Sequence, residues 1–237
     1  VGASDLWSFG AWGPHNGYPS CVTYHQGRRC YAGAPGLPQT VWMSRSDLYD
    51  DFSVSSPLQE DDAQTVTLVS GEINPIKGLL SMGRLLVFTS GAYWTLGDGK
   101  TPIGASTLLP EIQSYVGAYP LQPLGIAESA LFVHDGGGHV SDVTYAFTED
   151  KHISEDLNLS ADHLTDGYTI TGWAYQRRPF GIVWCVRSDG TLLGLTYNRR
   201  QVVAGWHRHD TKNGVFEAVA VVKESGVEVL YTLVTRN

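Results

Sequence analysis

The stretch "ITGWAYQRRPFGIVWCVRSDGTLLGLTYNRRQVVAGWHRH", residues 170–209, carries the clearest pattern in this chain of 237 residues. Apolar and polar residues alternate in four runs, and turn-forming pairs separate the runs at Arg178-Pro179, Asp189-Gly190 and Arg199-Arg200. A period of two is typical of strands that bury one face of a sheet. The stretch therefore predicts a meander of four antiparallel strands.

The same rhythm recurs along the rest of the chain. Further alternating runs, with turn residues between them, lie at Ser20–Gly33, Gln39–Ser46, Gln64–Gly71, Ile76–Gly97, Gln122–Tyr145 and Val215–Arg236. Corresponding first strands recur at roughly 40–55 residues, which is the spacing of four-stranded propeller blades. The sequence predicts an all-β fold, a β-propeller of about five blades whose last blade is incomplete.

Two connections interrupt the alternation. Lys151–Gly167 is polar, and we expect a loop there with a short helix over Ala161–Leu164 capped by Ser160. Tyr49–Gln64 is a longer acidic connection, and its three consecutive acidic residues 60–62 are expected to face solvent. Neither segment looks like a domain boundary, so residues 1–237 are expected to form one propeller-like domain.

Composition narrows the functional classes. The net charge is −8 and only 17% of residues are charged, below the roughly 25% of ordinary soluble domains. The nearest approach to a basic block is three isolated pairs, read as solvated turn residues: Arg28-Arg29, Arg177-Arg178 and Arg199-Arg200. The sequence therefore has no basic patch for nucleic acid. No apolar run is long enough for a membrane span. Because the chain lacks a starting Met, we expect a fragment of a longer protein.

The three cysteines are Cys21, Cys30 and Cys185, an odd number with no CxxC pair. Cys21 and Cys30 could face each other across a hairpin and form a disulfide. Reduced thiols in the core are the favoured interpretation.

His207 and His209 are the first candidates for chemistry. On a strand they share one face, with Trp206 on the other. Such a pair can begin a metal site, but it needs a third ligand, which could be His134, His139 or an Asp, and no spacing connects these residues. A structural role is favoured, in which Trp206 packs in the sheet and the histidines form hydrogen bonds across strands, so no metal site is predicted.

Signals for catalysis are weak. Asp189-Gly190 resembles the Asp-box of sialidase propellers, yet it occurs once and lacks the aromatic residue that follows, so a tight turn explains it. The "HDGGGHV" run (134–140) lacks a phosphate-loop pattern, and GxSxG is absent. The sequence therefore predicts no enzyme, no catalytic residue and no cofactor.

The N-terminal region holds the most specific motifs. It contains Trp12, then Gly17-Tyr18-Pro19, and later Pro38-Gln39-Thr40-Val41-Trp42. Proline before and within an edge strand stiffens the chain. We expect Trp7, Trp12, Tyr18 and Trp42 to close one aromatic cluster.

With Gln26-Gly27-Arg28, Ser44-Arg45 and Tyr49-Asp50-Asp51-Phe52, these motifs resemble a recurring piece of the tail tubular or nozzle proteins of short-tailed bacteriophages. The "GWHRHDT" run (205–211) resembles a blade strand of the same family. The resemblance covers most of the chain. It departs at Arg28-Arg29-Cys30, where the family more often has Arg-Leu followed within two residues by an aromatic.

The resemblance implies a structural component of the virion, made in the bacterial cytoplasm and placed in the phage tail. It implies a homo-oligomeric ring, a hexamer for the full-length protein, around a channel that retains and ejects double-stranded DNA. Other tail proteins and the host surface are the implied contacts. The motif residues would then be structural: Trp12, Gly17, Tyr18, Pro19, Pro38, Gln39, Trp42, Asp189, Gly190, Trp206, His207 and His209.

A different function stays open, a propeller that binds or cleaves carbohydrate on the bacterial surface. Trp94, Trp173, Trp184 and Trp206 could stack on sugar rings. Aromatic residues on alternating strands are more often blade core, so this is the alternative rather than the main hypothesis.

Overall fold

The computed structural model describes residues 10–146 and 151–236, which form four sheets of four strands and one hairpin. The first blade is β1 (Cys21–His25), β2 (Arg28–Ala34), β3 (Leu37–Met43) and β4 (Gln64–Thr67). The second is β5 (Ile76–Ser81), β6 (Leu85–Thr89), β7 (Tyr93–Leu96) and β8 (Pro110–Ser114). The third is β9 (Leu124–Ile126), β10 (Ser129–Val133), β11 (Val140–Ala146) and β12 (Lys151–Asp156). The fourth is β13 (Ile170–Gln176), β14 (Ile182–Arg187), β15 (Leu192–Asn198) and β16 (Val203–His209), and the terminal hairpin is β17 (Gly214–Glu224) and β18 (Val227–Arg236).

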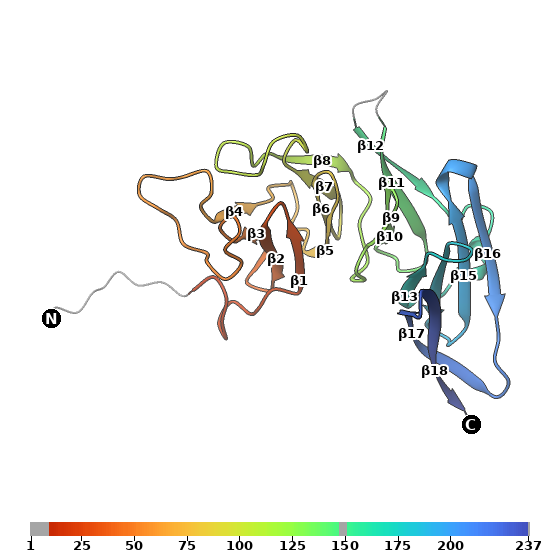
Figure 1. Cartoon of the computed structure of the whole chain (residues 1–237). Coiled ribbons are helices and arrows are strands. Elements are labelled where there is room, and N and C mark those ends of the chain that lie inside the picture. Colours follow the sequence, from red (N-terminus) through yellow and green to blue (C-terminus); the bar gives the residue numbers. More distant parts are fainter. Residues whose placement is uncertain (1–9, 147–150, 237) are drawn as a thin grey trace.

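Every sheet is an antiparallel meander in which strands that follow in sequence are also neighbours in the sheet. This is the topology of propeller blades. The sheets follow one another along an open arc, with the first blade at one end and the terminal hairpin at the other (Figure 1). The prediction of an all-β propeller with an incomplete last unit is confirmed, since the fifth unit has two strands.

Apolar layers between successive blades form the core. The first and second blades bury Cys30, Met43 and Val87 between them. Phe88 of β6 and Phe132 of β10 pack with their ring centroids 5.1 Å apart and join the second blade to the third. Because inner blades are covered on both faces, strands such as β6 are buried along their whole length, which explains their continuous apolar sequence.

The polar segment that follows residue 150 differs from expectation. β12 pairs with β11 from Lys151 opposite Ala146 to Asp156 opposite Ser141 and completes the third blade. The expected helix is a single 3₁₀ turn, Asp162–Leu164, and no side chain caps it. A strand at the outer edge of a blade is held by backbone pairing on one side, so it needs no apolar alternation.

The acidic connection 49–64 also differs, because Asp62 is buried rather than solvated. Its carboxylate accepts hydrogen bonds from Ser55 N (2.9 Å), Ser55 Oγ (2.8 Å) and Gln59 N (2.8 Å). Burial acts to raise the pKa of Asp62, but these hydrogen bonds outweigh it and hold the pKa below its usual value.

Arg28 anchors the same connection to the first blade. Its buried guanidinium donates to the carbonyls of Ser44 (2.7 Å), Asp62 (2.6 Å) and Glu60 (2.8 Å). Three carbonyl acceptors satisfy most of the donors of one guanidinium. The connection is therefore a folded part of the blade.

All three cysteines are free thiols in the core. Cys21 lies opposite Ala32, and Cys30 lies opposite Thr23, so the two are not cross-strand partners. Burial raises the pKa of Cys30 to about 12. Among the described residues, no helix has the length and apolarity needed to cross a membrane.

Candidate functional site

The histidine pair lies on β16 as the alternation predicts. Trp206 packs into the core layer between the third and fourth blades, and its Nε1 donates to Leu157 O at 2.9 Å. His207 and His209 share the other face, with His207 Nδ1 and His209 Nε2 2.7 Å apart. The two rings bond to each other within one strand, and His207 Nε2 also lies 3.5 Å from Thr196 Oγ1 of β15, which is the cross-strand contact that was expected of the pair.

Two neighbours in the sheet explain how the His207 ring fits. Trp184 contacts both imidazoles, with its ring centroid 5.1 Å from that of His209. Gly194 lies directly opposite His207, and a Cβ added there would approach His207 Cε1 to 2.1 Å. Burial lowers the pKa of His207, and the nearby His209 lowers it further. The imidazole therefore favours its neutral form and is part of the sheet packing.

No third ligand reaches this pair, since residues 10–146 and 151–236 hold no group of three His, Cys, Asp or Glu suited to a metal. His139 is held elsewhere, between Asp156 (2.8 Å) and Asp162 (2.9 Å). The hydrogen bond to Asp156 is the largest cause that raises the pKa of His139. His134 Nε2 lies 2.6 Å from Ser141 Oγ.

Asp189 and Gly190 form the β14–β15 turn. Arg187 donates hydrogen bonds to the Asp189 carboxylate from Nε (2.8 Å) and Nη2 (2.5 Å). Its guanidinium lies 3.8 Å from the centre of the Tyr168 ring. The hydrogen bonds from Arg187 hold the pKa of Asp189 well below its usual range. Gly190 has φ +81°, which favours glycine. The Asp189 carboxylate is therefore already engaged by hydrogen bonds within its own turn.

The N-terminal motif builds an aromatic cluster against the first blade. Trp12 contacts Tyr31, Trp42 and Phe52 edge-on, at 5.0, 5.6 and 5.2 Å between ring centroids. Tyr18, by contrast, is 66% exposed and lies outside the cluster, and Trp7 lies outside the described residues. The expected membership was wrong for Tyr18 because its neighbour Gly17, at φ +73°, turns the chain before β1.

The remaining motif residues have ordinary places in the first blade. Pro19 precedes β1, and Pro38 is the second residue of β3. Gln39 Nε2 lies 3.4 Å from Ser70 Oγ. The two motif sets lie on blades at different ends of the arc and do not form one site (Figure 1).

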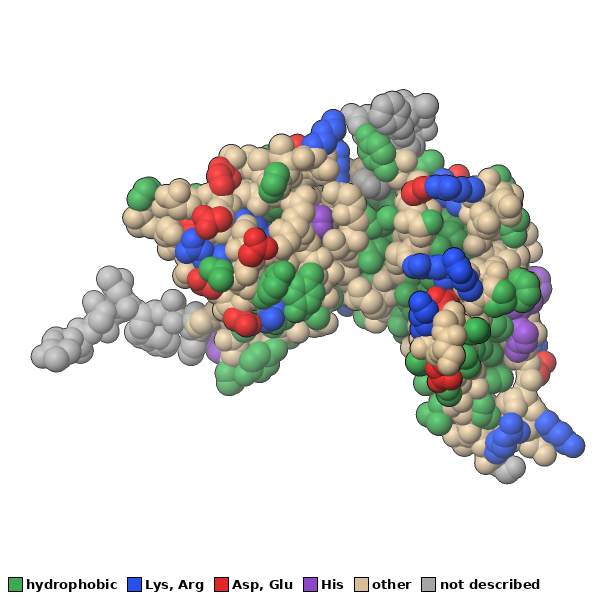
Figure 2. Space-filling view, in the orientation of Figure 1, with side chains coloured by type: hydrophobic (Ala, Val, Ile, Leu, Met, Phe, Trp, Pro, Cys, Tyr) green, Lys and Arg blue, Asp and Glu red, His purple; other side chains and the backbone are tan. Residues whose placement is uncertain are grey.

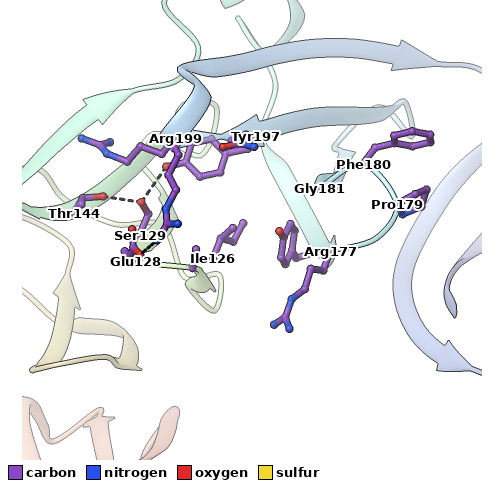
Figure 3. A pocket seen from close by; sticks show the side chains of 14 residues that line it. Ile126, Glu128, Ser129, Thr144, Arg177, Pro179, Phe180, Gly181, Tyr197 and Arg199 are labelled. Carbon is purple, nitrogen blue, oxygen red and sulfur yellow. Dashed lines mark hydrogen bonds and ion pairs between the residues drawn. The ribbon is translucent and has the colours of Figure 1, made fainter. Parts of the chain in front are cut away.

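A pocket of about 500 Å³ lies between the third and fourth blades (Figure 3). Three turns surround it: β9–β10, β13–β14 and the 3₁₀ turn Arg199–Gln201 after β15. The lining residues are Ile126, Ala127, Glu128, Ser129, Thr144, Tyr175, Arg177, Pro179, Phe180, Gly181, Tyr197, Asn198, Arg199 and Arg200.

A buried polar network forms the base of the pocket and joins the two blades. Asp142 of β11 is 1% exposed, and its Oδ2 accepts from Tyr197 Oη at 2.6 Å and from Arg199 Nη1. Ser129 Oγ lies 3.1 Å from Tyr197 Oη and 2.7 Å from Thr144 Oγ1. Burial, with Asp142 adding to it, raises the pKa of Tyr197 to about 12. The positive charge of Arg199 balances the negative charge of Asp142 within the network.

The rim of the pocket keeps an unpaired charge. Arg200 pairs with Glu128, whereas Arg177 forms no salt bridge or side-chain hydrogen bond within the described residues. Phe180, which is 72% exposed, and Tyr175 also line the pocket. A pocket that holds a free guanidinium and aromatic rings suits an anion with a flat apolar face.

Sequence reasoning missed this pocket because it treated the paired arginines as solvated turn residues. That interpretation is wrong for Arg199, whose charge is held by the buried Asp142. The signal available in the sequence was the recurrence of Arg pairs in two turns of one meander, at 177–178 and 199–200. The carboxylate partner lies 57 residues away from Arg199, so only the fold could reveal it.

Fold and site together define an all-β protein of stacked antiparallel blades with a pocket between two of them. No family model matches the chain, and no curated protein matches its sequence. Among solved structures, the β-propeller domain of Cps50 (Swd1) from Myceliophteria thermophila is similar, with a TM-score of 0.49 and 11% identity. The match covers 91% of this chain and 62% of that one.

Proposed function

We propose that this protein is a structural component of a bacteriophage tail nozzle, in which it forms part of a ring around the DNA channel. Besides the resemblance of its motifs, one observation carries the proposal: the arc of blades ends in an apolar sheet face that no described residue covers. Val227, Tyr231 and Leu233 alternate along β18 on that face and are 59%, 48% and 58% exposed. A propeller blade is ordinarily covered on both faces.

The other residues favour a structural role, in which the protein contacts other tail proteins, over a catalytic role. Apart from the exposed Tyr18, the motif residues of the first and fourth blades have structural places in the sheets and their turns. A net charge of −8 discourages the adhesion of DNA phosphates, as the passage of a genome requires. Extensive contacts with neighbouring tail proteins also fit the low share of charged residues.

The proposal is tested on phage particles. Antibodies raised against the purified chain, labelled with gold, are applied to particles of the phage that encodes it and viewed by electron microscopy. Labelling at the free end of the tail supports a nozzle protein. Labelling of the capsid alone, or of no virion at all, contradicts it.

The inter-blade pocket favours a second candidate function, the binding of acidic carbohydrate on the bacterial surface. Arg177 would pair with a sugar carboxylate, and Tyr175 or Phe180 would stack on the ring. Calorimetry with an acidic and a neutral polysaccharide tests this. Arg177→Ala is expected to abolish binding to the acidic polymer, while Arg178→Ala, next to it and outside the pocket lining, leaves binding unchanged. Equal effects of the two variants would exclude the pocket.

A further inference from the structure

His139 lies between two carboxylates that belong to different elements. The residue directly precedes β11, and its Nδ1 lies 2.8 Å from Asp156 Oδ2 at the end of β12. Its Nε2 lies 2.9 Å from Asp162 Oδ1 in the 3₁₀ turn. The imidazole therefore bridges the outer strand of the third blade and the connection that leads to the fourth blade.

This geometry requires a protonated ring. An ionised carboxylate only accepts hydrogen bonds, and a neutral imidazole carries a single N–H, so a neutral ring can donate to one of the two carboxylates. Only the imidazolium donates from both nitrogens. The hydrogen bond to Asp156 is the largest cause that raises the pKa of His139, and although burial opposes it, the charges of Asp156, Asp162 and Asp166 add to it.

The two contacts of His139 are unequal. Asp156 is held a second time, because its Oδ1 accepts from Asn158 N at 2.8 Å. The Asp162 side chain is 61% exposed, and within the described residues its carboxylate has no other hydrogen bond or ion pair. When the ring loses one proton, the remaining N–H therefore stays on Nδ1 toward Asp156. The lone pair of Nε2 then faces the Asp162 carboxylate, and the two repel each other.

The connection between the third and fourth blades, residues 157–169, has a fixed part and a loosely held part. We name these residues the connector. Asn158 and Thr165 are buried and bond to each other, Nδ2 to Oγ1, at 2.9 Å, and Asn158 Oδ1 also accepts from Val140 N at 2.9 Å. Between them, residues 159–163 are exposed except for the half-buried Ala161. Loss of the contact to Asp162 therefore frees residues 159–163 and leaves the rest of the connector in place.

Other charged groups beside the connector do not compete for His139. The His134 ring stacks on it with the centroids 5.9 Å apart. Burial lowers the pKa of His134, so that ring favours its neutral form, and Asp135 acts on His134. Arg187 of β14 donates to a carbonyl of the connector at 2.5 Å, but the charge of Arg187 is paired with Asp189.

Charges farther away act weakly on this ring. On the face of the molecule in Figure 2, acidic and basic side chains are interspersed in small groups along the arc. Exposed charges more than about 10 Å apart are largely screened at ordinary salt concentration. The protonation of His139 therefore depends chiefly on the groups that touch it, which are the two carboxylates and the His134 ring.

We propose that His139 is a proton-operated clasp for residues 159–163 of the connector. A protonated ring fixes Asp162 to the third blade, and a neutral ring releases Asp162 and keeps Asp156. Because folding raises the pKa of His139, the contribution of the clasp is fully present below about pH 6.5 and is lost as the pH rises through the higher pKa of the folded chain. The inference goes beyond the proposed function and does not depend on it.

Nitrogen-15 NMR of the full chain tests the clasp at the ring itself. With labelled histidine, both ring nitrogens of His139 are followed in a titration from about pH 5.5 to 9, which spans the range in which histidine changes charge. Both should be protonated at the acidic end. With rising pH, Nε2 alone should lose its proton, with a midpoint above about 6.5. The backbone amides of residues 159–163 should shift with the same midpoint.

Hydrogen exchange measures the release of the turn. Leu164 N donates to Ala161 O at 2.9 Å, so its protection reports whether the turn is formed. After correction for the intrinsic effect of pH on exchange, this protection should fall about tenfold or more across the titration, because a hydrogen bond from a charged group contributes at least that factor.

Two variants with opposite outcomes separate the clasp from a contact that is only structural. Asp162→Asn keeps a hydrogen bond in both states, because an amide accepts from a protonated ring and donates to a neutral one. Its turn should stay protected across the titration. His139→Phe keeps a flat ring and has no donor, so its turn should be unprotected at every pH. His163→Gln is the matched control, since His163 is exposed and forms no salt bridge or side-chain hydrogen bond within the described residues. It should behave like the unmodified chain.

Several results would overturn the clasp. One is a His139 midpoint at or below about 6.5, and another is a titration that leaves the amides of residues 159–163 unchanged. Loss of protection in Asp162→Asn with rising pH, as in the unmodified chain, contradicts it equally. If His139→Phe misfolds by circular dichroism, the exposed and nearly isosteric Asp162→Asn decides alone. Gold labelling of phage particles has no bearing on these results, so the clasp and the nozzle function can fail independently.

Discussion

His25 shows how a single residue couples the first blade to the second. Its Nδ1 lies 2.9 Å from Ser81 Oγ of β5. Its Nε2 is buried and has no hydrogen-bond partner within the described residues. Burial lowers the pKa of His25 to about 4, because a charged ring would lose its hydration there.

This gives a prediction for pH dependence. The unfolded chain takes up a proton at His25 below about pH 6.5, whereas the folded chain resists until about pH 4. The stability that depends on neutral His25 is therefore present above pH 6.5 and is lost as the pH falls toward 4, by roughly 3 kcal/mol in total. Urea unfolding at several pH values measures it.

His25→Gln is the comparison variant, because glutamine can still bond Ser81 and does not titrate. The variant should lose less stability between pH 7 and pH 4.5 than the unmodified chain does. The difference between the two isolates His25 from His139, whose raised pKa acts in the opposite direction. Parallel pH profiles would show that the folded protein protonates His25 as readily as the unfolded chain does.

At the scale of elements, the acidic connection 49–64 depends on one side chain of β2. Replacing Arg28 by Met removes the donors to three carbonyls, two of which are buried. We expect a loss of about 3 kcal/mol or more, since each hydrogen bond from a charged group contributes about 1.5–3 kcal/mol. Faster proteolysis within 49–64 should accompany it, and unfolding curves with timed digestion measure both.

Arg29→Met is the matched control from the next position. Arg29 lies on the other face of β2 and pairs with Asp50, whose side chain is 88% exposed. Exposed pairs contribute only about 0–1 kcal/mol, so this variant should remain close to the unmodified chain. Equal losses at both positions would mean that Arg28 does not anchor the connection.

Some strands of this fold can be recognised from the sequence and others cannot. Inner strands such as β6 and β15 carry apolar runs because two blades cover them. β8 and β12, the fourth strands of their blades, were missed or read as loop. Backbone pairing along one edge holds such strands, and that pairing leaves no mark in the pattern of side chains.

At the scale of the whole molecule, the blades are joined by side chains that are far apart in the sequence. Tyr197 of the fourth blade donates to Asp142 of the third. We expect Tyr197→Phe to cost about 1–3 kcal/mol, because it leaves a buried carboxylate short of a donor. Tyr175→Phe, in the same pocket but without a hydrogen bond to its hydroxyl among the described residues, should cost less than about 0.5 kcal/mol. Urea unfolding measures both, and similar costs would show that the Asp142 network does not hold the blades together.

Taken by itself, the sequence determined the class of fold, the number of repeating units and the incomplete last one. It also determined that His207 and His209 share a face of β16. These properties follow from alternation and turn residues, which act over a few positions. Only the tertiary structure decided that Asp62 is buried, that Arg199 pairs with Asp142, and that Val227, Tyr231 and Leu233 of the terminal hairpin stay exposed. Those features arise from contacts between residues tens of positions apart, and a local pattern does not specify which distant side chain will meet another.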